Sequence, residues 1–173
     1  MLLIRRISQL LCVAGCLEMA LPAHAAANQA LPLECKLTLP ASGKAGSPVE
    51  LGFELISHDK RTLWVLGWNT PLEGLRNVFL RVSRDGEEVP YVGPMFKRGN
   101  PAREAYRQIR PGGSLHASVE LGLAYDLSKP GVYRVEWAGK LFDVIAAPKR
   151  PPRPLSQHQM QALECASVEV RLN

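Results

Sequence analysis

Hydrophobic and polar residues alternate along most of this chain, the pattern of strands that bury one face. In the first such run, Leu33, Cys35, Leu37 and Leu39 are separated by polar residues. The same alternation predicts strands with inward apolar residues within segments 49–55, 115–121, 133–137 and 168–172. Cys165 is out of phase with the last of these runs, so we expect it before that strand or at a bulge.

Two runs depart from simple alternation. "TLWVLGW" is apolar on both faces, which predicts a central strand. Asp85-Gly86 between "FLRV" and "VPYV" predicts a hairpin, whose second arm is brief or at an edge because of Pro90. We also expect "KLFDVIA" to pair with the preceding strand across Gly139, and "LSQHQMQALE" to form one or two helical turns.

Seven or eight short strands with frequent turn signals predict an all-β fold, an immunoglobulin-like β-sandwich of antiparallel strands. Fourteen Gly and fourteen Pro in 173 residues suit such a turn-rich domain. We expect one sandwich domain over residues 26–173, with a Pro/basic crossing segment at 146–154 and a last strand at about 167–172.

The first residues have the features of an export signal. Arg5 and Arg6 precede a short apolar region, and Ala23-x-Ala25 is a cleavage pattern, so residues 1–25 are expected to be a signal peptide. A second interpretation stays open. "VAGC" has the form of a bacterial lipobox, which would make 1–15 a lipoprotein signal and Cys16 the lipidated residue. Both routes predict a periplasmic or secreted protein, with membrane attachment only through Cys16.

Cleavage after Ala25 would leave two cysteines, Cys35 and Cys165. An even pair in an oxidising compartment predicts one disulfide, with two buried free thiols as the alternative. The cleavage would also lower the formal net charge from +5 to +4. So mild a charge permits an acidic partner or a membrane surface without requiring either, and we expect no nucleic-acid partner.

No catalytic or metal-binding motif is present in the sequence. There is no H-E-x-x-H, no G-x-S-x-G and no phosphate-binding glycine motif, so we expect no catalytic residue, metal or cofactor. His58, His116 and His158 lack metal-ligand spacing and are expected at the surface. Asp126 is expected to cap a turn with Ser128.

Two segments are candidates for a binding surface. The corner "WNTPLEG" contributes Trp68 and Asn69, and a long irregular segment follows the hairpin. That segment is either a solvated loop or a patch for an acidic partner. Its candidate contact residues are Lys97, Arg98, Arg103, Tyr106, Arg107 and Arg110.

The run "WNTPLEG", "FLRVSRDGEEVPYVGPMFKRGNP", "IRPGGS" and "VELGLAYDLSKPGVYRVEW" resembles the N-terminal domain of deuterolysin-type (peptidyl-Lys) zinc metalloendopeptidases. The resemblance covers about residues 48–138. It implies an immunoglobulin-like sandwich that precedes a catalytic domain with H-E-x-x-H. The sequence ends at Asn173, about where that catalytic domain should begin, so no catalytic residue can be assigned by resemblance.

The favoured hypothesis is an exported, non-catalytic binding or accessory module, related to proteases or inhibitor-like, with a protein partner that could be a protease. One alternative is a secreted enzyme related to metalloproteases with an unrecognised site. The other is a structural envelope lipoprotein.

The two export routes predict different mature N-termini. Signal-peptide cleavage leaves a free N-terminus at residue 26, whereas the lipoprotein route leaves a diacylated Cys16. Intact-mass spectrometry of the exported protein distinguishes them. A free N-terminus at residue 26 would eliminate the lipoprotein alternative, and a lipid-modified Cys16 would eliminate the freely soluble form.

Overall fold

The computed structural model describes residues 32–173, and within them it is all-β. The expected signal peptide, its cleavage site and Cys16 lie outside the described residues. No helix of the described part is long and apolar enough to cross a membrane. The strands are β1 Leu33–Thr38, β2 Ser42–Gly43, β3 Glu50–Ser57, β4 Leu63–Leu66, β5 Leu80–Arg84, β6 Glu87–Val89, β7 Tyr106–Ile109, β8 Ser114–Glu120, β9 Gly131–Trp137, β10 Lys140–Leu141, β11 Val144–Ala146, β12 Gln161–Ala162 and β13 Val168–Leu172. The short 3-10 turns are η1 Pro71–Glu73, η2 Arg103–Ala105, η3 Leu121–Leu123 and η4 Leu155–Gln157.

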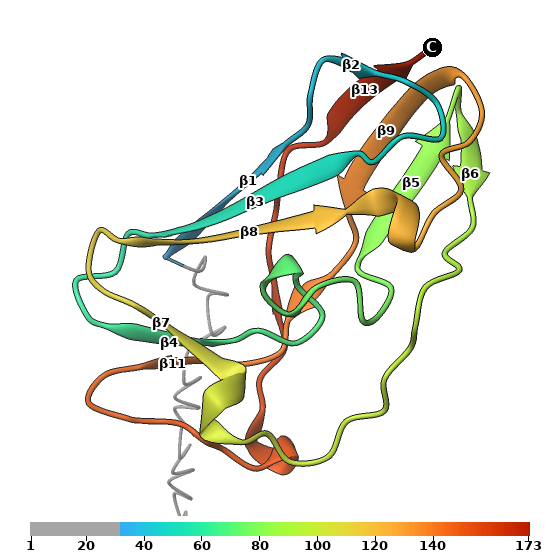
Figure 1. The fold of residues 1–173 in the computed structure, drawn as a ribbon. Coiled ribbons are helices and arrows are strands. Elements are labelled where there is room, and N and C mark those ends of the chain that lie inside the picture. The colour runs from blue at the N-terminus through green and yellow to red at the C-terminus, as the bar shows by residue number, and fades with distance from the viewer. Residues whose placement is uncertain (1–31) are drawn as a thin grey trace, which may run out of the picture.

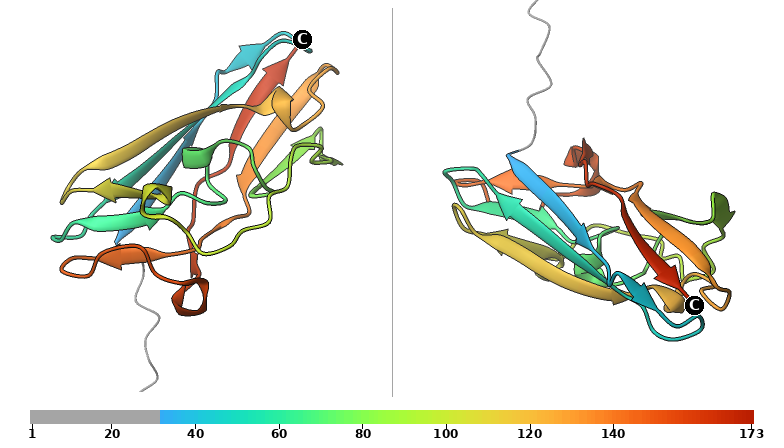
Figure 2. Two further views of the ribbon diagram at one scale, coloured as in Figure 1. Left: turned by 60° about the horizontal axis from the view of Figure 1, so that its bottom comes forward. Right: turned by 90° about the horizontal axis from the view of Figure 1, so that it is seen from above.

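Two sheets form the sandwich. The first is antiparallel and has the order β1-β3-β8. The second has the order β2-β13-β9-β5-β6, in which β2 runs parallel to β13 and the other neighbours are antiparallel. Figures 1 and 2 show the two sheets facing one another. The Asp85-Gly86 hairpin joins β5 to β6, as the turn signal predicted.

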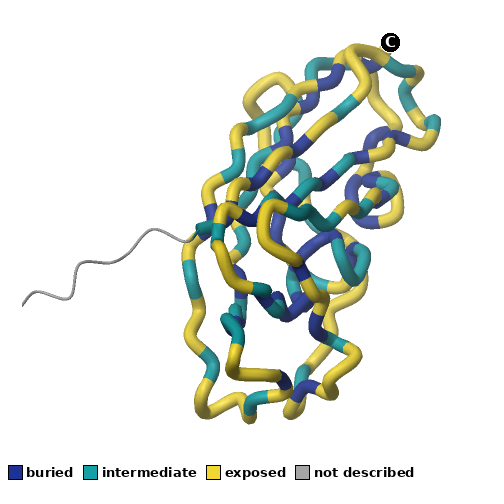
Figure 3. Tube along the Cα trace, turned by 90° about the vertical axis from the view of Figure 1, so that its left-hand side faces the viewer, coloured by how far each residue is buried: buried dark blue, intermediate teal, exposed yellow. Residues whose placement is uncertain are grey.

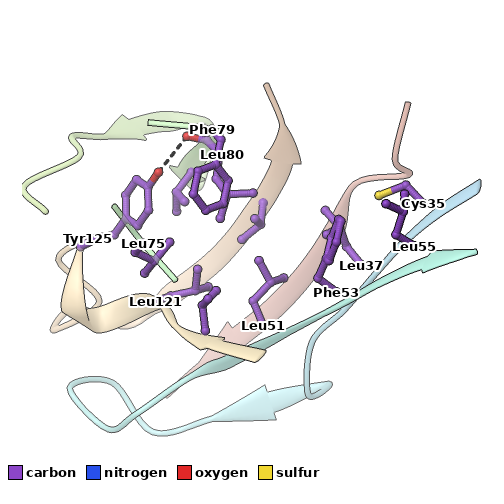
Figure 4. Close-up of a cluster of buried hydrophobic side chains, with 14 of the residues drawn as sticks. Cys35, Leu37, Leu51, Phe53, Leu55, Leu75, Phe79, Leu80, Leu121 and Tyr125 are labelled. Atoms are coloured by element: carbon purple, nitrogen blue, oxygen red, sulfur yellow. Dashed lines mark hydrogen bonds between the residues drawn. The ribbon is translucent and has the colours of Figure 1, made fainter. Parts of the chain in front are cut away.

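The core lies between these sheets, because their alternating residues point inward. Leu51, Phe53 and Leu55 come from β3, and they face Val135 and Val170 of the second sheet. Figure 4 shows the three side chains of β3 within the core, and Figure 3 shows buried positions alternating with exposed ones along the strands. The Trp137 ring stacks on Phe53 at 5.9 Å between centroids.

A buried tyrosine supports the immunoglobulin-like assignment. Tyr133 is fully buried near the start of β9, and its hydroxyl donates a 2.8 Å hydrogen bond to the Lys129 carbonyl. A tyrosine at this corner, bonded to the backbone a few residues upstream, is typical of such sandwiches. With the strand order it confirms the predicted fold class.

Three long connections build a third sheet. Segments 58–79, 90–113 and 138–167 each contribute one strand, and the order is β11-β4-β7. In Figure 1 this sheet lies below the left part of β3 and β8, beside the second sheet. One of its faces, with Leu63, Val65 and Ile109, joins the main core. The other face carries a separate apolar cluster of Leu66, Trp68, Tyr106 and Ile145.

Two local expectations were wrong. Residues of "KLFDVIA" do not pair with β9: β10 pairs with β12, and β11 pairs with β4. The second pairing covers one edge of β4, the strand expected to be central. "LSQHQMQALE" forms only the 3-10 turn η4 and then β12. Leu155 and Met160 are exposed and only Leu163 of this run is buried, so no apolar helix face packs on the rest of the fold.

Cys35 and Cys165 form a disulfide, as predicted. Cys165 precedes β13 and makes an isolated parallel bridge with Cys35 of β1, which explains why it is out of phase with the strand. The bond therefore ties the first sheet to the segment that enters the second.

Replacing both cysteines, Cys35→Ala with Cys165→Ala, is expected to lower the free energy of unfolding substantially. The cysteines are 130 residues apart, so the cross-link restricts most of the unfolded chain. The chain-entropy estimate is about 4–5 kcal/mol, as an upper value. Urea unfolding measures it, and a reducing agent should destabilise the native protein but not the double variant. An unchanged unfolding midpoint would contradict this role.

Candidate functional site

The corner "WNTPLEG" is a capped 3-10 turn. Thr70 is its N-cap: its hydroxyl donates to the Gly67 carbonyl at 2.7 Å and accepts from the Leu72 amide at 3.2 Å. Pro71 occupies the first turn, where a missing N–H costs nothing. Trp68, just before the turn, is buried in the cluster on the outer face of the third sheet. The corner is therefore a rigid part of the scaffold.

Asn69 has an unusual backbone conformation in this corner. Its φ is 55°, in the left-handed region that Asn tolerates better than most residues. Its backbone N–H donates to the Glu73 carboxylate at 2.7 Å. Its buried side-chain oxygen has no hydrogen-bond partner within the described residues. The side chains of Glu73 and Thr70 therefore accept the backbone N–H groups of this turn, and the Asn69 side chain makes no such hydrogen bond.

Arg98 joins this corner to the basic segment. Its guanidinium lies 2.6 Å from the Glu73 carboxylate and 5.1 Å from the centre of the Trp68 ring. The ion pair is largely shielded from water, because Arg98 is 23% exposed and Glu73 13%. An arginine that stacks on an aromatic face and pairs with a carboxylate is well fixed. The two candidate segments, whose relative position the sequence left open, are therefore in direct contact.

A groove runs between these segments and the edge strand β8. Its volume is about 450 Å³, and its apolar lining comes from Leu75, Pro94, Phe96, Val119 and Leu123. Of these five residues, Pro94, Phe96 and Leu123 are exposed, whereas Leu75 and Val119 are buried beneath them. Exposed apolar side chains gathered around one groove are typical of interaction surfaces.

The backbone holds the groove's outer wall in place. The Val92 amide bonds to the Ala124 carbonyl at 2.8 Å, and the Phe96 amide bonds to the Arg76 carbonyl at 3.2 Å. The Tyr91 hydroxyl lies 2.8 Å from the Pro94 carbonyl and 3.2 Å from that of Leu75. The apolar side chains are therefore presented in a defined arrangement, which reduces the entropy cost of binding.

The structure distributes the sequence-based candidate residues over different environments. Trp68 and Tyr106 are buried in the cluster of the third sheet. Asn69 and Arg98 are half-buried at the corner, while Lys97, Arg103, Arg107 and Arg110 are exposed. Arg107 and Gln108 are adjacent in β7, so their side chains point to opposite faces of the third sheet. The basic residues thus do not form one continuous patch.

Sequence reasoning missed a buried polar network on the outer face of the third sheet. Asp143 is fully buried, and its carboxylate accepts two hydrogen bonds from the Arg153 guanidinium and one from the Tyr106 hydroxyl at 2.9 Å. The Nε2 atom of His158 lies 3.0 Å from the Arg153 carbonyl and 3.4 Å from the Tyr106 hydroxyl. Asp143 is the single acid inside the apolar run "KLFDVIA", and that position was the sequence signal for a buried carboxylate.

This network attaches the Pro/basic segment to the third sheet. Burial, together with the Asp143 carboxylate, raises the pKa of Tyr106 to about 12, so the phenol stays a neutral donor at ordinary pH. Arg153 also bonds to the Val144 carbonyl at 3.3 Å. The paired charges make this arrangement a structural clamp.

The other titratable candidates have local partners. His58 pairs with Glu34 at 2.9 Å, and His116 lies 2.9 Å from the Ser114 hydroxyl; both are exposed, as expected. His158 is half-buried, against the expectation of a surface position. Asp126 caps its turn by accepting from the Ser128 amide, and Ser128 lowers the pKa of that carboxyl. Residues 32–173 hold no group of three or more side chains suited to a metal ion.

Comparison with known proteins finds a similarity to part of an extracellular protease. No family model matches the chain. An extracellular protease of Aeromonas hydrophila is 30% identical over 105 residues, which are 61% of this chain. They are only 30% of the protease, so the chain spans less than a third of that relative's length. Among solved structures, the ASH/PapD-like domain 7 of human CEP192 aligns over 98% of both chains at 15% identity, but its TM-score of 0.33 is too low to support an argument.

Arg153→Ala is expected to destabilise the protein by about 3–5 kcal/mol, because it leaves the buried Asp143 carboxylate without its cation. The matched control is Arg134→Ala. Arg134 pairs with Glu136 and Glu169 at the surface, where solvent screens ion pairs, so its loss should change stability much less. Equal losses for both variants in urea unfolding would contradict the clamp.

Proposed function

We propose that this chain is an exported, non-catalytic accessory module that binds a protein partner through the groove between the "WNTPLEG" corner and the basic segment. The observation that carries the proposal is the group of exposed apolar residues Pro94, Phe96 and Leu123 in the lining of this groove, held in place by backbone hydrogen bonds. Immunoglobulin-like sandwiches commonly bind through loops gathered on one part of the fold. Here the long connections have that role.

A protease is the partner class that we favour. The support is the similarity to part of an extracellular protease, in a chain that matches only 30% of that relative. The motif likeness to the N-terminal domain of deuterolysin-type metalloendopeptidases points the same way. An accessory domain of this kind could dock on a protease and act as an inhibitor or a folding aid. The disulfide fits a periplasmic or secreted location.

The proposed groove can be tested by photo-cross-linking in the producing cells. The cross-linker p-benzoylphenylalanine replaces Phe96 in the groove and, as a matched control, Met160, an exposed apolar residue on another segment. We expect an exported protein, a protease in the favoured case, to be captured from position 96 only. Leu123→Asp should reduce this capture at least tenfold, since it puts a charge in the apolar lining, whereas Met160→Asp should not.

Two outcomes would contradict the proposal. One is the absence of any product specific to position 96, provided that both proteins are exported and folded. The other is enzymatic activity of the purified chain, seen as stoichiometric zinc in metal analysis together with cleavage of casein. That result would favour the alternative of an enzyme with an unrecognised site.

A further inference from the structure

A second concave surface lies on the outer face of the third sheet. It has a volume of about 370 Å³ and is separate from the apolar groove. Trp64 of β4 and Gln108 of β7, which are opposite one another in the sheet, form its floor. Its rim includes Thr62, Arg103, Lys149 and Arg150. The basic segment and the Pro/basic segment, far apart in the sequence, therefore meet here.

The three cations of this pocket have no carboxylate partner among residues 32–173. Arg103 lies 5.8 Å from the centre of the Trp64 ring, and no acidic side chain is part of the described lining. Arg98 and Arg153, from the same two segments, are each paired with an acid. The two segments thus each use one arginine in an ion pair. The three remaining cations, Arg103, Lys149 and Arg150, lie around the Trp64 ring without a counter-charge in the described part of the chain.

Like charges gathered without counter-charge repel one another, and an anionic ligand relieves that repulsion. Arginine binds carboxylates through two parallel hydrogen bonds, lysine acts as a point charge, and the Gln108 amide can bond a peptide group. The indole of Trp64 offers an apolar surface for the stem of an acidic side chain. The pocket therefore has the chemistry to hold one or two carboxylates together with their apolar stems.

The surroundings favour a peptide over a long polyanion. Arg107 points to the opposite face of the third sheet, and neither it nor Arg110 lines the pocket, so no basic track leads away from it. β7 is an outer strand of its sheet, and one side of its backbone has no strand partner in the described part of the chain. An extended peptide can use such an edge while its side chains enter a neighbouring pocket.

We infer that the pocket formed by Trp64, Arg103, Gln108, Lys149 and Arg150 recognises an acidic peptide segment, rich in Asp or Glu, of the protein partner. This inference rests on the proposed function, because it assigns the chemistry of one part of the partner. It adds a second, electrostatic contact to the apolar groove. The groove would provide affinity through buried area, and the pocket would select a partner by charge.

The probe is an end-capped hexaglutamate peptide with a fluorescent label, titrated with the exported chain in its oxidised form at low salt. We expect saturable binding of hexaglutamate and none of hexaglutamine. Arg103→Gln or Arg150→Gln should each weaken binding about tenfold, since each removes a charge-assisted contact. Arg107→Gln and Arg110→Gln, which remove the same charge outside the pocket, should change it less than about twofold.

Three results would overturn the inference: no saturable binding of hexaglutamate, equal weakening by all four variants, or tighter binding of a heparin hexasaccharide or inorganic phosphate at the same residues. The last result would assign the pocket to a different anion. Cross-linking from position 96 reports separately on the groove. If cross-linking from position 96 persists while hexaglutamate binding fails, the pocket inference alone is wrong. If the cross-linking also fails, the proposed function is wrong.

Discussion

Strand β4 is apolar on both faces, and both faces must be shielded from water. The third sheet and the long connections around it meet this requirement. Leu63 and Val65 enter the main core, while Leu66 packs with Trp68 and Tyr106 on the other side. A sandwich of two sheets would cover only one of these faces. The connections that bring in β7 and β11 complete a sheet around β4, and the segments flanking them cover its outer cluster. The long irregular segments are thus part of the folded structure.

Polar groups in these covering segments must be satisfied because they pack on apolar surface. Arg98 meets Glu73 at the corner, and Arg153 meets Asp143 in the third sheet. Each ion pair fixes one long segment to a neighbouring part of the chain. The remaining cations, Arg103, Lys149 and Arg150, are left around the Trp64 pocket. The cations of this pocket are therefore those not used for holding the segments in place.

The similarity to an extracellular protease fits this division between scaffold and surface. It covers 61% of the chain and 30% of the relative. A sandwich shared between proteins does not itself define an activity, because function depends on the site that each one carries. For this chain the apolar groove and the basic pocket are the sites to test.

The alternating pattern determined the sandwich, its inward residues and the Asp85-Gly86 hairpin, since alternation and turn residues act locally. Compartment and cysteine number were enough to predict the disulfide between Cys35 and Cys165, which is present. The corner and the basic segment were also recognised as candidate surfaces, but not their contact. Only the tertiary structure decided that Arg98 joins them, that "KLFDVIA" pairs with β4, and that Asp143 is buried. These features depend on contacts between distant segments, for which a single sequence has no periodic signal.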